Sequence, residues 1–177
     1  VTMSESKPKD VTTHKRVNQT IISALERPAL KWLAEHMPAW VTPDLLTGIG
    51  FFAAVLTGVS YFLCRYSPWF LWLATFGFIL NWFGDSLDGT LARYRKIERP
   101  RYGFFIDHAI DALVELIIIL GLGASQYVSL TIALGTLIGY HMLSILVFLY
   151  TYVSGEFRIS YGNMGPTEAR LIGIVAN

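Results

Sequence analysis

The sequence predicts an all-α integral membrane protein, a bundle of transmembrane helices that follows an amphipathic helix at the membrane surface. Of its 177 residues, 53% are hydrophobic and 15% are charged, whereas soluble domains carry about 25% charged residues. The apolar residues gather in runs of the length that a helix needs to cross a bilayer, about 20 residues. The basic residues gather in alternate connections between these runs, which is typical of membrane proteins that obey the positive-inside rule.

Residues 1–42 are predicted to form a polar tail and a juxtamembrane amphipathic helix. Apolar residues recur at helical spacing from residue 12 on, and Pro28 is expected to break this helix in two. Trp32 and Trp40 have the character of interfacial anchors, so the helix is expected to lie in the headgroup zone. Docking of the same helix on the membrane domain is the alternative, and both can hold together.

Residues 43–177 form the predicted membrane domain, with four complete spans and the beginning of a fifth helix. The four spans are expected at residues 45–64, 69–87, 103–123 and 129–153. The last helix begins at Pro166, because a proline closely followed by an acidic residue is typical of a helix N-terminus. Only about ten residues of it precede Asn177, which is too short to cross a bilayer. We therefore expect that the C-terminal helices are missing from this chain.

The distribution of basic residues predicts the orientation of the spans. Lysines and arginines precede the first span and follow the second and the fourth, which puts all of them on one side of the membrane. The two short turns on the opposite side carry Arg65 alone. The positive-inside rule then puts the N-terminus and the connection between the second and third spans in the cytoplasm.

Four aspartates stand where the second span ends and the third begins: Asp85, Asp88, Asp107 and Asp111. A carboxylate beside an apolar run is costly unless it is paired or binds a cation. The spacings of three and four residues put each pair on one face of its helix. Because the connection between the pairs is rich in arginine and lysine, the pattern indicates metal ions that hold a phosphorylated substrate. Ion pairs that only hold helices together are the structural alternative.

One extended pattern contains these aspartates: Asp85-x-x-Asp88-Gly89-x-x-Ala92-Arg93, nine residues, then Gly103-x-x-x-Asp107-x-x-x-Asp111. It resembles the signature of the CDP-alcohol phosphotransferase family, and every fixed position is filled. The similarity extends, in the order of spans and loops, from residue 42 to the C-terminus. The resemblance implies a membrane enzyme with six transmembrane helices, usually a homodimer. In such an enzyme an alcohol attacks the phosphorus of a CDP-linked donor, and CMP leaves.

The resemblance assigns divalent cations, two ions of Mg²⁺ or Mn²⁺, to Asp85, Asp88, Asp107 and Asp111. Carboxylate oxygens are the ligands that such hard cations prefer. Two cations can stabilise both the attacking and the leaving oxygen of a phosphoryl displacement. In the family the last aspartate, here Asp111, is also the catalytic base that takes the proton of the acceptor hydroxyl.

The other four positions of the signature are expected to contact the nucleotide: Gly89, Ala92, Arg93 and Gly103. The two glycines would let a nucleotide approach the backbone closely, and the small Ala92 would leave room for a ring. Arg93 would offer its fork of donors to diphosphate oxygens. Asp44 stands where the family usually has asparagine, which leaves a nucleotide contact at that position open.

Two branches of the family differ in donor and acceptor. The small size and the compact spans favour transfer of a phosphatidyl group from CDP-diacylglycerol to a small polar alcohol, as in bacterial enzymes of the inner membrane. His108 directly after Asp107 is typical of the other branch, which transfers phosphocholine or phosphoethanolamine to diacylglycerol. Arg158 and Arg170 could hold an acceptor phosphate or lie at the membrane interface. Glu115 extends the acidic face of the third span by one turn.

Two interpretations belong to other classes of protein. A cation channel or transporter would explain the four aspartates, but not the glycines, the alanine and the arginine at fixed spacing. A catalytically inactive scaffold would not need the complete set of aspartates. Membrane lipids are expected as partners, and nucleic acids are not.

Overall fold

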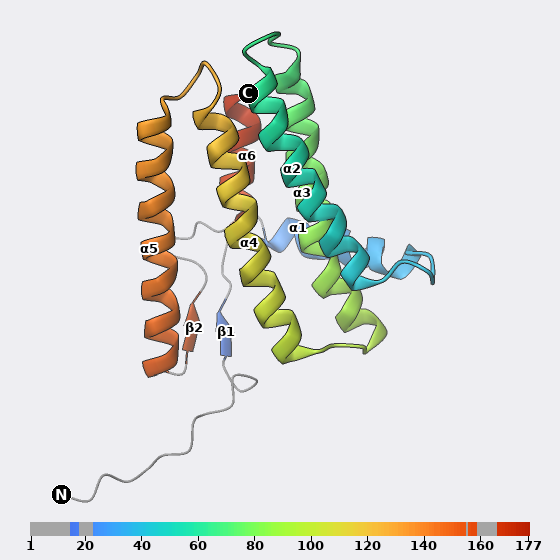
Figure 1. Ribbon diagram of the computed structural model, residues 1–177. Coiled ribbons are helices and arrows are strands. Elements are labelled where there is room, and N and C mark those ends of the chain that lie inside the picture. Colours follow the sequence, from blue (N-terminus) through green and yellow to red (C-terminus); the bar gives the residue numbers. More distant parts are fainter. Residues whose placement is uncertain (1–14, 18–22, 155, 159–165) are drawn as a thin grey trace, which may run out of the picture.

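The computed structural model describes residues 15–17, 23–154, 156–158 and 166–177, and these form six helices and two short strands (Figure 1). The helices are α1 (Ser23–His36), α2 (Pro43–Leu63), α3 (Phe70–Arg95), α4 (Pro100–Gly123), α5 (Leu130–Ser154) and α6 (Pro166–Ala176). The strands β1 (Lys15–Val17) and β2 (Glu156–Arg158) pair in parallel. The prediction of a helical bundle is confirmed.

The long helices α2 to α5 run roughly alongside one another, whereas α1 lies across them (Figure 1). Within the described residues, α2, α3 and α5 are long and apolar enough to cross a membrane. α4 has a similar length, but Asp107, Asp111 and Glu115 interrupt its apolar surface. Three of the four predicted spans therefore meet this criterion, and α4 joins them by packing against α2 and α5.

The second span extends further than the sequence predicts. α3 continues through the first aspartate pair to Arg95 instead of ending near Leu87, because no proline follows and Gly89 is tolerated inside the helix. Lys96 then ends the helix in the left-handed conformation, with a φ of 56°. Since α4 already begins at Pro100, the basic connection is a short loop of residues 96–99.

α1 is continuous through Pro28, which was predicted to break it. Contacts with α3 on both sides of the proline hold the helix together. Before it, Glu26 accepts hydrogen bonds from Trp82 Nε1 at 2.7 Å and Ser86 Oγ at 2.9 Å. After it, the buried Leu30 packs into an apolar cluster with residues of α2 and α3. This packing outweighs the loss of one backbone hydrogen bond at the proline.

The amphipathic helix predicted from residue 12 is wrong in its first part, because Lys15–Val17 pair with Glu156–Arg158 as a strand. Residues 12–14 and 18–22 lie outside the described residues. Trp32 and Trp40 are 58% and 74% exposed, as interfacial anchors would be. The structure therefore supports the docked helix, and its place at the membrane surface stays a prediction.

One close crossing of the bundle brings α2 and α3 together at glycines. A Cβ atom added to Gly84 would lie 2.5 Å from the carbonyl oxygen of Leu46 and 2.6 Å from the backbone nitrogen of Gly50. No side chain separates the two backbones there, so the polar residues of α2 and α3 on either side of the crossing lie within reach of one another.

We predict that Gly84→Ala lowers the stability of the bundle by roughly 1–3 kcal/mol, because the added methyl group forces the two backbones apart. The measurement is the thermal unfolding midpoint of the detergent-solubilised protein. Gly48→Ala on α2 is the matched control, since among the described residues no atom outside its own stretch of helix lies within 4 Å of the Cβ it would add. Equal losses in the two variants would contradict the close crossing.

Candidate active site

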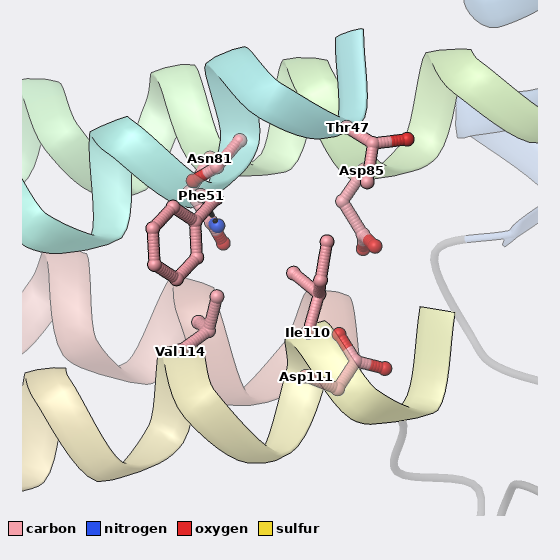
Figure 2. A pocket seen from close by; sticks show the side chains of 8 residues that line it. Thr47, Phe51, Asn81, Asp85, Ile110, Asp111 and Val114 are labelled. Carbon is pink, nitrogen blue, oxygen red and sulfur yellow. Dashed lines mark hydrogen bonds between the residues drawn. The ribbon is translucent and has the colours of Figure 1, made fainter. Parts of the chain in front are cut away.

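The two predicted aspartate pairs lie on helices that face each other. Asp85 and Asp88 are on α3, and Asp107 and Asp111 are on α4. Asp85 and Asp111 line one small cavity between α2, α3 and α4, and Figure 2 shows their carboxylates turned toward each other across it. The cavity is also lined by Thr47, Gly50, Phe51, Asn81, Ile110 and Val114.

Asp88 lies beside this cavity and is held by α2. Its side chain is buried, with 7% exposure. Thr47 Oγ1 donates a hydrogen bond to Asp88 Oδ2 at 2.6 Å, and the backbone N–H of Gly89 donates to Oδ1. Asp85 and Asp107 are near enough to interact with Asp88 electrostatically. All four predicted aspartates therefore belong to one acidic region.

Arg170 reaches this acidic region from α6. Its guanidinium pairs with Asp85 at 2.8 Å, and its side chain is only 12% exposed. It also interacts electrostatically with Asp111 and Glu115. Arg170 therefore lies in the polar interior and not at the membrane interface. The side chain of Arg158 lies outside the part of the chain that is described. An arginine–aspartate pair, the structural alternative for these carboxylates, is present at Asp85.

The four expected nucleotide contacts lie on both sides of the short loop of residues 96–99. Gly89, Ala92 and Arg93 are in the last turns of α3, and Gly103 is in the first turn of α4. Arg93 Nη2 donates to Thr90 Oγ1 at 3.1 Å, and its guanidinium lies close to Gly89. In the described part of the chain, no atom outside the adjoining backbone of α4 lies within 4 Å of the position that a Cβ of Gly103 would have. Three of the positions therefore share the end of α3, Gly103 follows the loop, and their binding of a nucleotide stays a prediction.

The sequence model of one protein family, CDP-alcohol phosphatidyltransferase, matches residues 40–176. The chain belongs to this family. The match begins near the N-terminus of α2 and covers both aspartate pairs and Arg170, so it contains every element of the acidic region. The resemblance in the aspartate pattern is thereby confirmed over most of the chain.

Curated relatives come from both branches of the family. The chain is 30% identical to cholinephosphotransferase 1 of Danio rerio over 156 residues, which are 81% of this chain and 39% of that protein. It is 33% identical to archaetidylinositol phosphate synthase of Pyrococcus horikoshii over 104 residues, 59% of this chain and 52% of that one. It is 38% identical to phosphatidylinositol phosphate synthase of Cutibacterium acnes over 84 residues, 47% and 38% of the two chains. The chain thus spans about half, or less, of the length of these relatives.

The CDP-alcohol phosphatidyltransferase family implies divalent metal ions, and the donor chemistry of the acidic region suits them. Carboxylates and a threonine hydroxyl are hard oxygen ligands of the kind that Mg²⁺ takes. The arrangement differs from a preformed site, because among the described residues no three acidic, histidine or cysteine side chains are grouped closely enough to hold an ion. Asp85 instead has the guanidinium of Arg170 as its positive partner.

Asp44, which replaces the asparagine usual in the family, has a partner of its own. Arg99, in the loop between α3 and α4, forms a hydrogen-bonded ion pair with Asp44 and lies over the ring of Tyr102 at 4.2 Å. The hydrogen bond to Asp44 raises the pKa of the Arg99 guanidinium. Since both side chains are about half exposed, the pair contributes little to stability, but it links the loop to the start of α2.

Arg95 has a structural role that the sequence did not indicate. Its guanidinium donates to the carbonyl oxygens of Met37 at 3.0 Å and Pro38 at 2.8 Å, and also to that of Val41. These carbonyl groups lie between the end of α1 and the start of α2. The Arg95 side chain therefore links the last turn of α3 to the segment that connects α1 with α2. Because Thr47 is in the second turn of α2, this tie also helps to position the partner of Asp88.

Two polar residues of the bundle were missed by the sequence analysis. Asn81 lies on α3 one turn before Asp85 and lines the cavity; a carboxamide inside an apolar run could have been noticed as unusual. Tyr140 on α5 hydrogen-bonds to Glu115. Nothing in the sequence distinguishes this tyrosine from the other aromatic residues of its span.

We predict that Arg95→Met lowers stability by about 1–3 kcal/mol, because partly buried carbonyl groups lose their hydrogen-bond donors while the apolar stem is kept. The midpoint of thermal unfolding in detergent would measure the effect. Lys96→Met, at the exposed neighbouring position, is the control and should leave the midpoint unchanged. The assignment would be wrong if both variants unfolded like the parent protein.

Proposed function

We propose that this chain is the core of a membrane enzyme that transfers a substituted phosphate group from a CDP-linked donor to an alcohol and releases CMP. The observation that carries the proposal is the meeting of Asp85 and Asp111, from two helices, at one cavity beside the Thr47-bound Asp88. Membership of the CDP-alcohol phosphatidyltransferase family supports it. A channel or transporter would account for the aspartates but not for the rest of the signature.

In the proposed reaction the oxygen of the acceptor alcohol forms a bond to the donor phosphorus. The bond between this phosphorus and the CMP oxygen breaks, and the acceptor proton passes to the carboxylate of Asp111. Thr47 fixes the direction of the Asp88 carboxylate through its hydrogen bond. Arg93 would bind the diphosphate, and Gly89, Ala92 and Gly103 would leave space for the nucleotide.

Divalent cations, two ions of Mg²⁺ or Mn²⁺, would be held by Asp85, Asp88, Asp107 and Asp111. When bound, they would stabilise the charge that develops on the phosphoryl oxygens and on the leaving CMP. The proposal rests on the hard oxygen donors of these residues. It also requires that Arg170 gives up its pairing with Asp85 in favour of another anion, for which a substrate phosphate is suited.

For the donor and acceptor we favour a phosphatidyl group from CDP-diacylglycerol and a small polar alcohol. The position of Arg170 supports this choice, because a largely buried guanidinium near Asp111 could bind an acceptor that carries a phosphate. The relatives named phosphatidylinositol phosphate synthase and archaetidylinositol phosphate synthase belong to the same family.

A second candidate is transfer of phosphocholine or phosphoethanolamine from a CDP-alcohol to diacylglycerol. Two observations favour it. The match to a cholinephosphotransferase covers 81% of the chain, and His108 follows Asp107 as in that branch. In the structure His108 lies on the side of α4 that meets α5, with its ring 5.2 Å from that of Phe148.

The setting of the enzyme is part of the proposal. The apolar helices and the family support an integral membrane protein. We propose that the N-terminus and the acidic region face the cytoplasm, as the distribution of basic residues predicts, and that the protein is a homodimer. The bacterial inner membrane is the proposed location for the phosphatidyl-transfer branch.

The function is tested with purified full-length protein in detergent and Mg²⁺, by measuring CMP release. We expect release with CDP-diacylglycerol and a polar alcohol, and its loss when EDTA removes the metal. Release only with CDP-choline and diacylglycerol would select the second candidate. No release with either set would refute the transfer reaction.

We predict that Asp111→Asn abolishes turnover while CDP binding remains largely intact, since the amide cannot take the acceptor proton. Turnover is followed as CMP release, and binding by isothermal titration with CDP. Glu35→Gln, an exposed position on α1, is the control and should keep full activity. An active Asp111→Asn variant would exclude this residue as the base.

A further inference from the structure

The cavity between α2, α3 and α4 has a charged end and an apolar end. Thr47, Asp85 and Asp111 line the charged end, while Phe51 and Val114 line the other. In Figure 2 the two carboxylates lie at one side of the view and the ring of Phe51 at the other. Asn81 is the polar side chain beside the apolar end.

The orientation of the Asn81 amide is fixed by its neighbour. Its nitrogen Nδ2 donates a hydrogen bond to the carbonyl oxygen of Gly50 at 2.9 Å. Because a carbonyl oxygen can only accept, the nitrogen and not the oxygen of the amide must face Gly50. The other atom, Oδ1, is buried and has no hydrogen-bond partner among the described residues. The whole residue is only 2% exposed.

An unsatisfied amide oxygen in the centre of a membrane bundle is costly, so its presence requires a reason. Packing of α2 against α3 is not sufficient, because Gly50 and Gly84 already bring the backbones together. Thr57 offers a comparison on the same pair of helices. It is fully buried, but its hydroxyl donates to the carbonyl of Ala53 at 2.9 Å within its own helix. Asn81 Oδ1, in contrast, accepts no hydrogen bond from its own helix or from any other described residue.

We propose that Asn81 Oδ1 accepts a hydrogen bond from a second, non-reacting hydroxyl group of the acceptor alcohol. Asn81 is then a specificity-determining residue that selects a polyol. The inference rests on the proposed transfer reaction and makes its acceptor class more specific. Asn81 and Asp85 are four residues apart on α3, a rise of about 6 Å. Asn81 and Asp111 line the same cavity, so a polyol with one hydroxyl at Asp111 would direct a second hydroxyl toward Asn81.

The chemistry of Oδ1 distinguishes between the two branches. An acceptor oxygen needs a donor, and diacylglycerol has a single hydroxyl, which is consumed in the reaction; its other oxygens only accept. A polyol phosphate has further hydroxyl groups that can donate. A site that hydrogen-bonds a substrate hydroxyl discriminates strongly against the analogue that lacks it, because the buried polar group is then left unpaired.

The test compares polyol acceptors with their deoxy analogues, using full-length wild-type protein, CDP-diacylglycerol and Mg²⁺. One pair is glycerol 3-phosphate and 3-hydroxypropyl phosphate; the second set is myo-inositol 1-phosphate and its monodeoxy analogues. We expect kcat/KM for CMP release to fall roughly tenfold to hundredfold when the recognised hydroxyl is missing. Equal values for every polyol and its analogues in wild type would overturn the proposal without any variant.

The variant Asn81→Leu identifies the residue responsible, since it has a similar volume and no polar atom. In this variant we expect the ratio of kcat/KM for the polyol to kcat/KM for its deoxy analogue to approach one, while the analogue is still turned over. Thr57→Val is the matched control for loss of a buried polar group on the same helix pair, and its ratio should equal that of wild type. If Asn81→Leu does not fold, Asn81→Thr is measured instead. An unchanged ratio, or an equal loss with both acceptors, would mean a structural role or a bound water only.

The outcomes separate this inference from the reaction on which it rests. CMP release only with CDP-choline and diacylglycerol would overturn the polyol site and leave the transfer of a substituted phosphate standing. No release with any donor and acceptor would refute the proposed function, and the inference with it.

Discussion

The backbone contact between α2 and α3 is the constraint on which the acidic region depends. Gly84 and Gly50 allow the two helices to touch without intervening side chains. As a result, the hydroxyl of Thr47 reaches Asp88, and the amide of Asn81 reaches the carbonyl of Gly50. A larger residue at the crossing would therefore pull apart both hydrogen bonds, although it would not replace any charged residue.

Around this crossing the bundle places its charges in a consistent way. The carboxylates of α3 and α4 face inward, where α6 supplies Arg170 as a positive partner for Asp85. Of the basic residues near the loop, Arg95 binds carbonyl groups and Arg99 binds Asp44. Asp85 thus has a cationic partner inside the bundle, while Arg95 and Arg99 connect segments at the end of the bundle.

Features that depend on local pattern were predictable from the sequence, and those that depend on distant partners were not. The apolar runs and the aspartate spacing predicted the long helices and the acidic region, because both follow from helix geometry. The end of α3 was placed too early, since a polar helix end resembles a loop in sequence. The continuity of α1 through Pro28 depends on Glu26 and Leu30 packing against α3, and the binding of Arg95 to carbonyl groups depends on a distant turn. No local pattern encodes such contacts.

The pairing of Arg170 with Asp85 has a consequence for biogenesis. Because α6 follows α3 and α4 in the chain, the ribosome delivers both acidic helices before it delivers this arginine. Until then Asp85 lacks its cationic partner, and a carboxylate without a partner is unfavourable in a membrane. The late arrival of α6 therefore supplies the cationic partner of Asp85 and couples the final folding of the acidic region to the synthesis of α6.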